Sequence, residues 1–113
     1  MSAFYYGKSR NDQQYYFRLR DNNNETILSS TEGYQTEQAC LTGIAAVKKN
    51  APEDSNYKRF NGTDAKYYFT LRASNYEPIG KSEGYNTAQS RDGGIENCKK
   101  EAPGAEVKKL EAF

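Results

Sequence analysis

The side chains of this sequence that could do chemistry are aromatic, guanidinium and carboxylate groups that recur in pairs. Tyr16, Arg18 and Arg20 in the first half have counterparts in Tyr68 and Arg72, which lie 52 residues further along. Aromatic rings interleaved with arginine can stack on bases and hold phosphates, as they do on surfaces that bind single-stranded nucleic acid. The pattern therefore predicts an interaction face, for nucleic acid or for another protein surface.

A second repeated group contains a carboxylate. It is formed by Glu32, Gly33 and Tyr34 and returns as Glu83, Gly84 and Tyr85. Two carboxylates at a fixed separation could serve as the acid and base of a glycosidase-like enzyme. The alternative is structural, with glycine supplying an unusual backbone angle and tyrosine packing on the start of a helix. We favour the structural interpretation, because distance in sequence gives no reason for the two carboxyl groups to meet.

The composition excludes most catalytic chemistry. The chain has no His, which removes the commonest general base and the commonest metal ligand. Its two cysteines, Cys40 and Cys98, cannot form a Cys-rich metal site by themselves and are typical of small buried hydrophobic residues. We expect no catalytic residue, no cofactor and no metal ion.

The overall charge is nearly balanced. Sixteen basic and fifteen acidic residues give a net charge of +1, which supplies no electrostatic reason to expect a polyanion or a membrane surface as partner. We therefore favour a non-enzymatic interaction module, able to form a homodimer through its Tyr/Arg face or an edge strand, over a nucleic-acid binder. No apolar run approaches the roughly 20 residues of a spanning helix. The first residues lack a signal-peptide pattern, so we expect a cytoplasmic protein.

The elements that must position these residues also occur twice. The hexapeptide YYFRLR at residues 15–20 returns as YYFTLR at residues 67–72. Both are rich in strong strand formers, and strand side chains alternate between two faces. Each hexapeptide is therefore predicted to be a central strand with one apolar face. The face that carries Tyr16, Arg18 and Arg20 is predicted to meet water.

Shorter strands and a helix are predicted around each central strand. In the first half the strands fall near residues 3–6 and 26–30, and a helix runs from the N-cap Thr36 to Asn50, which is predicted to adopt a left-handed cap conformation. In the second half the strands fall near residues 56–60 and 78–82, and a helix capped by Thr87 reaches residue 101. A last short strand is predicted at residues 107–110.

The repeat predicts the architecture. A half of roughly 50 residues would not bury one face of its own sheet. We therefore expect an α+β fold in which two tandem β-β-β-α repeats, about 3–54 and about 55–113, share one mostly antiparallel sheet. Both helices should lie on one face, related by a pseudo-two-fold axis, and residues 1–113 should form a single domain.

These motifs resemble those of the YegP-like family of small bacterial proteins, which carry the unit singly or in tandem. The residues that match are 31–34, 43–44 and 48–52 in the first copy, and 82–85, 93–95 and 99–103 in the second. The resemblance covers nearly the whole chain. It implies tandem β-β-β-α repeats that share a sheet, and it implies no activity and no catalytic residues.

The second helix departs from the pattern of the first. Arg91 falls on its core-facing line and should either reach solvent or pair with a carboxylate. Gly93 and Gly94 lie inside this helix and cost about 1 kcal/mol each relative to alanine. We expect the second helix to pack less tightly, with the glycines allowing it to approach the sheet closely.

Overall fold

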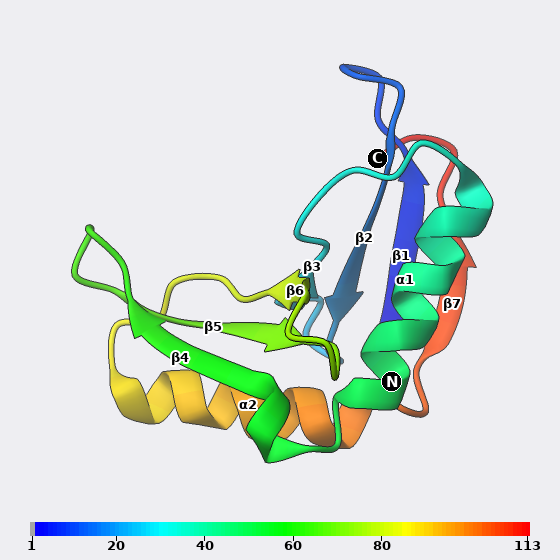
Figure 1. Cartoon of the computed structure of the whole chain (residues 1–113). Coiled ribbons are helices and arrows are strands. Elements are labelled where there is room, and N and C mark those ends of the chain that lie inside the picture. The colour runs from blue at the N-terminus through cyan, green and yellow to red at the C-terminus, as the bar shows by residue number, and fades with distance from the viewer. Residues whose placement is uncertain (1) are drawn as a thin grey trace.

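Alternation along the repeated hexapeptides sets the two sides of the sheet. A computed structural model describes residues 2–113, and in it the hexapeptides form strands β2 (Tyr15–Arg20) and β5 (Tyr67–Arg72), as predicted (Figure 1). Phe17 and Leu19 in β2, like Phe69 and Leu71 in β5, are fully buried. The residues between them are partly exposed, because the pleat turns successive side chains to opposite faces.

Each central strand lies between two strands of equal or shorter length. The neighbours are β1 (Ala3–Lys8) and β3 (Thr26–Ser29) in the first half, and β4 (Tyr57–Asn61) and β6 (Pro78–Lys81) in the second. A short 3₁₀ helix, Asp54–Asn56, precedes β4. The predicted last strand is β7 (Glu106–Lys109), which pairs in parallel with β1.

The two halves share one seven-stranded sheet in the order β4-β5-β6-β3-β2-β1-β7. They meet where Ser29 of β3 pairs with Lys81 of β6, its own counterpart 52 residues later. A contact between equivalent positions marks a pseudo-two-fold axis, as it does at an isologous interface. The prediction of one mostly antiparallel shared sheet is therefore confirmed, and Figure 1 shows that the sheet bends sharply between the halves.

Both helices begin at the predicted threonines. Thr36 Oγ1 accepts a hydrogen bond from the backbone N–H of Ala39 at the start of α1 (Glu37–Asn50), at 3.1 Å. Thr87 caps α2 (Ala88–Glu101) in the same way. The left-handed cap predicted at Asn50 is wrong. The chain stays right-handed into Ala51 (φ −59°), whose N–H bonds to the carbonyl of Val47.

Each helix covers strands of both halves. Helix α1 lies against β1 and β2 and also reaches β5 and β6, whereas α2 lies against β5 and β3. The buried residues form one cluster that includes Phe17 and Leu28 from the first half and Phe69 and Ile95 from the second. We infer that residues 2–113 fold as one unit, because separating the halves would expose this shared core.

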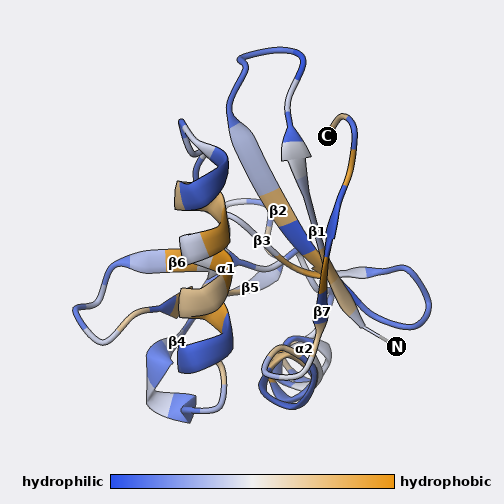
Figure 2. Cartoon of the chain, turned by 90° about the vertical axis from the view of Figure 1, so that its right-hand side faces the viewer, coloured by the Kyte–Doolittle hydropathy of each residue, from blue (hydrophilic) through white to orange (hydrophobic). Residues whose placement is uncertain are grey.

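Helix α2 carries the thinner apolar stripe, in agreement with the sequence. It buries Ile95 and Cys98, whereas α1 buries four residues. Figure 2 shows orange hydrophobic segments along α1, while α2 is mostly hydrophilic. Arg91 pairs with Asp92 at 3.2 Å, and its guanidinium lies 5.5 Å from the ring centroid of Tyr67. The arginine is therefore accommodated by a carboxylate and an aromatic ring.

Candidate interaction face

The predicted Tyr/Arg residues all lie on the face of the sheet opposite the helices, which we call the outer face. Tyr16, Arg18 and Arg20 come from β2, and Tyr68 and Arg72 from β5. All five are partly exposed. The structure thus places the predicted residues on one face, in two groups separated by β3 and β6.

The pairing registers place a row of basic side chains straight across this face. In strand order the row is Lys58, Thr70, Lys81, Ser29, Arg18, Tyr5 and Lys108. A cation therefore stands on every second strand. Because neighbouring strands are about 4.8 Å apart, successive cations start about 10 Å from one another.

Acidic residues are nearly absent from the sheet. Glu106 is the only one in the seven strands, and the others lie in turns, loops and helices. Within residues 2–113, five outer-face cations have no carboxylate within ion-pair distance: Arg18, Arg20, Lys58, Arg72 and Lys81. The cations that are paired on the helix side are Arg59, Arg91, Lys99 and Lys109. A balanced net charge therefore conceals a basic outer face.

Two tyrosines at the ends of this face are held by hydrogen bonds to aspartates. The hydroxyl of Tyr16 donates to Asp12, and that of Tyr68 donates to Asp64. These hydrogen bonds, together with backbone N–H groups, hold the pKa of both carboxyls below the usual range. The tyrosines are thereby fixed in orientation by the turns that precede their strands.

These pairs predict a specific loss of stability in acid. A carboxyl whose pKa is lower in the folded state stabilises the protein above its unfolded pKa of 3.8, and this contribution disappears as the pH falls through the folded value. We expect the double variant Asp12→Asn/Asp64→Asn to show a smaller decrease in unfolding free energy between pH 5 and pH 2.5 than the parent. Urea denaturation at each pH measures the difference.

The matched variant for this test removes the donors instead. Tyr16→Phe/Tyr68→Phe keeps both carboxylates but lets their pKa values return toward 3.8, so its profile should be flattened similarly. Parallel profiles for all three proteins below pH 4 would contradict a role for the Tyr–Asp pairs in acid stability.

Aromatic rings cover both tyrosines, by different routes. In the second half Phe60 of β4 stacks on Tyr68, with centroids 5.5 Å apart and planes 13° apart. In the first half the residue opposite Tyr16 is Gly7, and Phe113 from the segment after β7 stacks there instead, at 6.1 Å and 18°. A methyl group added at Gly7 would lie 3.5 Å from Cβ of Phe113. Phe113 thus fills the place that Phe60 occupies in the other repeat.

The arginines of the first half are also engaged. The guanidinium of Arg18 lies 4.5 Å from the ring centroid of Phe113. Arg20 donates to Asn24 at 3.2 Å and lies 5.7 Å from the ring centroid of Tyr5. The first half of the predicted face is therefore more covered than the sequence indicated.

Sequence reasoning missed several outer-face residues. They are Lys58, Phe60, Tyr76, Lys81, Lys108 and Phe113. Alternation along β4 could have placed Lys58 and Phe60 on one face, but only the pairing register shows that this is the face of Tyr68. Phe113 gave no signal, because its position depends on a contact with residues near the start of the chain.

The two Glu-Gly-Tyr loops are built as packing motifs. The glycines lack a positive φ, so the predicted unusual backbone angle is wrong. Their role is close approach, since a methyl group on Gly33 would lie 2.8 Å from Cζ of Tyr16. Tyr34 bonds to the backbone of Tyr15 and stacks on Phe17, with centroids 6.3 Å apart. Gly84 and Tyr85 repeat this arrangement against Tyr67, Tyr68 and Phe69.

The loops do not bring their carboxylates together. Strands β2 and β5 run in opposite directions, because each step through β3 and β6 is antiparallel. The loops beside the starts of β2 and β5 therefore lie at opposite ends of the sheet, and three strand intervals alone separate them by about 14 Å. Glu32 and Glu83 are both exposed. This separation argues against an enzyme that uses Glu32 and Glu83 as paired carboxylates.

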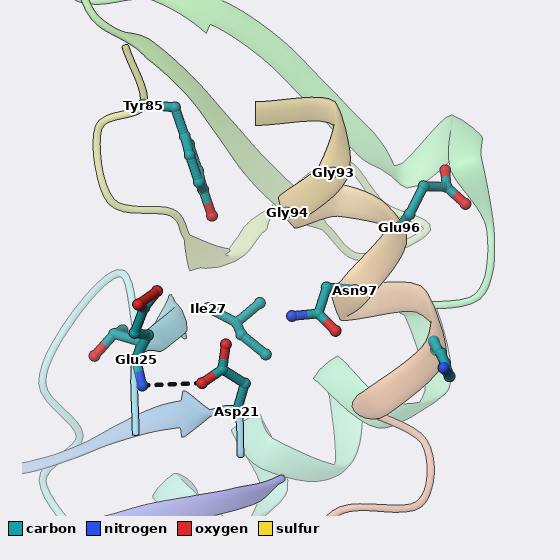
Figure 3. Close-up of a pocket in the computed structure, with 10 residues that line it drawn as sticks. Asp21, Glu25, Ile27, Tyr85, Gly93, Gly94, Glu96 and Asn97 are labelled. Carbon is teal, nitrogen blue, oxygen red and sulfur yellow. Dashed lines mark hydrogen bonds between the residues drawn. The ribbon is translucent and has the colours of Figure 1, made fainter. Parts of the chain in front are cut away.

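A separate cavity of about 450 Å³ lies between the β2–β3 turn and α2. Figure 3 shows the hydroxyl of Tyr85 and the amide of Asn97 directed into it, and Glu96 directed away. The carboxylate of Asp21 accepts N–H bonds from Asn23 and Glu25 at 2.9 and 3.0 Å. Because its best-placed carboxylate already holds the turn, this cavity is a weaker candidate than the outer face.

Two other kinds of site find no support in the described residues. Within residues 2–113 no three His, Cys, Asp or Glu side chains are grouped closely enough to hold a metal ion. Cys40 and Cys98 are buried and do not form a disulfide, and burial raises the pKa of each thiol to about 11. Both therefore stay protonated near neutral pH and are poor nucleophiles.

Comparison with known proteins identifies the family. The family model described as "Domain of unknown function (DUF1508)" matches twice, over residues 11–57 and 63–108, in register with the two halves of the sheet. The chain belongs to the DUF1508 family. The resemblance to YegP-like proteins predicted from the repeated motifs is thereby confirmed.

Relatives of this DUF1508 protein match over most of its length. It is 45% identical to a UPF0339 protein of Stutzerimonas stutzeri over 83% of this chain and 84% of that one. It is 37% identical to the UPF0339 protein YegP of Escherichia coli, over 96% and 97% of the two chains. The solution structure of Escherichia coli YegP superposes with a TM-score of 0.90 at 38% identity, covering 99% of this chain and 95% of that one.

A second solved structure, a UPF0339 protein of Shewanella oneidensis, gives a TM-score of 0.88 at 32% identity, covering 97% and 92% of the two chains. Its likeness supports the same tandem DUF1508 fold. The helices in residues 2–113 are too short and too polar to cross a membrane.

Proposed function

We propose that this protein is a non-enzymatic binding module that holds single-stranded nucleic acid on its outer face. The observation that carries the proposal is the row of cations that crosses all seven strands, most of them without a carboxylate partner in residues 2–113. Unpaired cations at regular spacing favour a ligand with regularly spaced negative charge. Such contacts gain free energy by releasing counterions from the ligand.

The aromatic residues favour a single strand. Phe60 and Tyr76 are the exposed aromatic side chains, 38% and 72% accessible, and both border the outer face of the second half. Bases of a single strand are free to stack on such rings, whereas bases of a duplex are already stacked on one another. An exposed sheet face with rings and cations suits a single strand.

The same charges argue against self-association through this face. Two copies placed face to face would bring like charges together, which costs several kcal/mol at interfaces. The edge strands β4 and β7 carry Lys58, Arg59, Lys108 and Lys109, and charged residues of this kind protect sheet edges from pairing. A homodimer therefore fits the geometry less well than a polyanionic ligand.

Titration of a fluorescein-labelled oligothymidine, followed by anisotropy at several salt concentrations, tests the proposal. The triple variant Arg18→Gln/Lys58→Gln/Lys81→Gln should bind about tenfold more weakly at low salt. Its plot of log affinity against log salt should be shallower by about 2, since each contact to a single strand contributes about 0.7.

The control removes the same charge elsewhere. Lys8, Lys49 and Lys100 are exposed and lie off the outer face, so changing these three to glutamine alters net charge equally. We expect this control to keep the parent's salt slope. Equal losses in both triple variants, or no binding by the parent at low salt, would overturn the proposal. A concentration-dependent mass in ultracentrifugation without oligonucleotide binding would replace it with self-association.

A further inference from the structure

One part of the outer face is hollowed into a site of nucleotide size. This groove, which we call the Arg72 groove, has a volume of about 350 Å³. Its lining residues are Lys58, Phe60, Thr70, Arg72, Tyr76 and Pro78. They supply two cations, two aromatic rings and two hydroxyl groups, and none of them is acidic.

Arg72 is held ready for an acceptor. Its guanidinium lies 5.2 Å from the ring centroid of Tyr76, and its Nε is buried. That N–H has no hydrogen-bond partner in the described chain, as is also true of Nε of Arg20 in the first repeat, and the Arg72 guanidinium makes no ion pair or other hydrogen bond there. A buried donor without an acceptor is destabilising, so a ligand oxygen that reaches it would gain the missing bond.

The backbone conformation and exposure of Tyr76 also point to a ligand at this groove. Its backbone is left-handed, with φ of 68°, which is rare for a bulky side chain. The equivalent position of the first repeat holds Asn24, which is also left-handed, with φ of 64°. Asparagine is suited to this conformation. A tyrosine that is 72% exposed in a strained turn is not explained by packing. Residues held in such conformations cluster where ligands bind.

The pseudo-symmetric position in the first repeat is not an equivalent groove. Gly7 stands where Phe60 stands, and Phe113 covers Tyr16. Asn24 replaces Tyr76, and its amide oxygen accepts a hydrogen bond from Arg20. The first repeat has a hollow of similar size, about 320 Å³, beside Tyr16 and Phe113, but that hollow includes Asp12 and has no counterpart of the exposed Tyr76. The Arg72 groove is therefore the part of the outer face that combines an exposed ring with cations and has no carboxylate in its lining.

We propose that the Arg72 groove binds one nucleotide of the strand, with its base against Tyr76 and Phe60 and its phosphate on Arg72 and Lys58. This rests on the proposed function, since the same face must bind the rest of the strand. Rings and cations on one short groove match a ligand that carries a planar base and a phosphate together.

The test combines two variants with two matched controls. Tyr76→Asn installs the residue of the first repeat and should fold well, while its affinity for oligothymidine should fall about fivefold or more, as expected for loss of one stacked base. Arg72→Gln should weaken binding and make the salt slope shallower by about 0.7. The controls are Ala65→Asn, which has the same left-handed backbone in another turn, and Lys100→Gln on α2. Both should bind like the parent.

A second measurement separates the sources of binding. Thymidine 5′-monophosphate added to the full ¹⁵N-labelled chain should shift the amide signals of Thr70, Arg72 and Tyr76, and inorganic phosphate alone should shift them much less. Equal shifts from phosphate would contradict the stacking role. If the parent binds oligothymidine but Tyr76→Asn and Arg72→Gln match their controls, this groove assignment is wrong while the proposed function stands. If the parent binds no strand, both fail.

Discussion

Replacing Gly80 by leucine should destabilise the protein by about 3 kcal/mol or more, and removing Leu28 should recover much of that loss. The two positions are counterparts across the pseudo-two-fold axis, 52 residues apart. A methyl group added at Gly80 would lie 2.5 Å from Cδ2 of Leu28 and 2.7 Å from its Cγ. Because Leu28 is fully buried, it cannot swing away, and overpacking a core costs 1–3 kcal/mol or more.

The informative protein is the swap Gly80→Leu/Leu28→Gly. Leu28→Gly alone leaves a cavity and should cost about 2–5 kcal/mol, as large-to-small core changes do. In the swap the leucine side chain occupies the same space from the other strand. We expect its cost to fall short of the sum of the single costs by about 1–3 kcal/mol, a coupling typical of residues in contact.

Urea denaturation of all four proteins gives this cycle directly. Gly80→Ala and Leu28→Ala form a milder cycle if the leucine variant does not fold. Additive effects in both cycles would show that the two side chains do not compete for one space, contrary to the asymmetric packing at the axis.

This packing also shows which part of the fold local sequence could not predict. The repeated hexapeptides and the capping threonines were predictable, because strand formers and N-caps act through neighbouring residues. The asymmetry of Leu28 and Gly80 has meaning only once β3 and β6 meet. That pairing consists of a single register contact, Ser29 with Lys81, between residues far apart in the chain.

The outer face illustrates the same limit for function. Five of its residues followed from strand alternation alone. The cation row required the order of seven strands and five antiparallel registers plus one parallel one, and none of these is local. The net charge of +1 argued against a polyanion, because a sum over residues cannot show that cations and carboxylates occupy different faces. Topology, rather than composition, produces the basic surface.

Two adjacent glycines of α2 should respond to alanine with opposite signs. Gly93 is exposed, and a methyl group there would meet no atom within 4 Å. Gly93→Ala should therefore stabilise the protein by about 1 kcal/mol, the difference in helix propensity. At Gly94 the added methyl group would collide with the hydroxyl of Tyr85 and lie 2.8 Å from its Cζ and 3.3 Å from Cε2 of Phe69.

Gly94→Ala should accordingly destabilise by about 1–3 kcal/mol despite the better helix former. Tyr85 cannot retreat easily, because its backbone is bonded to Tyr67 and its ring stacks on Phe69 with centroids 6.4 Å apart. Removing the hydroxyl of Tyr85 should relieve the collision. The unfolding free energy lost through Gly94→Ala should therefore be smaller in the Tyr85→Phe background than in the parent. Urea midpoints of the four proteins measure the effect.

The first repeat supplies an internal replicate of this experiment. Gly43 faces Tyr34 as Gly94 faces Tyr85, with an added methyl group 2.5 Å from the hydroxyl oxygen and 2.8 Å from Cζ. Gly43→Ala should therefore be destabilising, and its cost in unfolding free energy should be smaller in the Tyr34→Phe background. Equal stabilisation by alanine at positions 43, 93 and 94 would mean that helix propensity alone determines the effect of each substitution on stability. The Glu-Gly-Tyr motif would then have no part in setting how closely each helix approaches the sheet, and the structural interpretation of that motif would fail in both repeats.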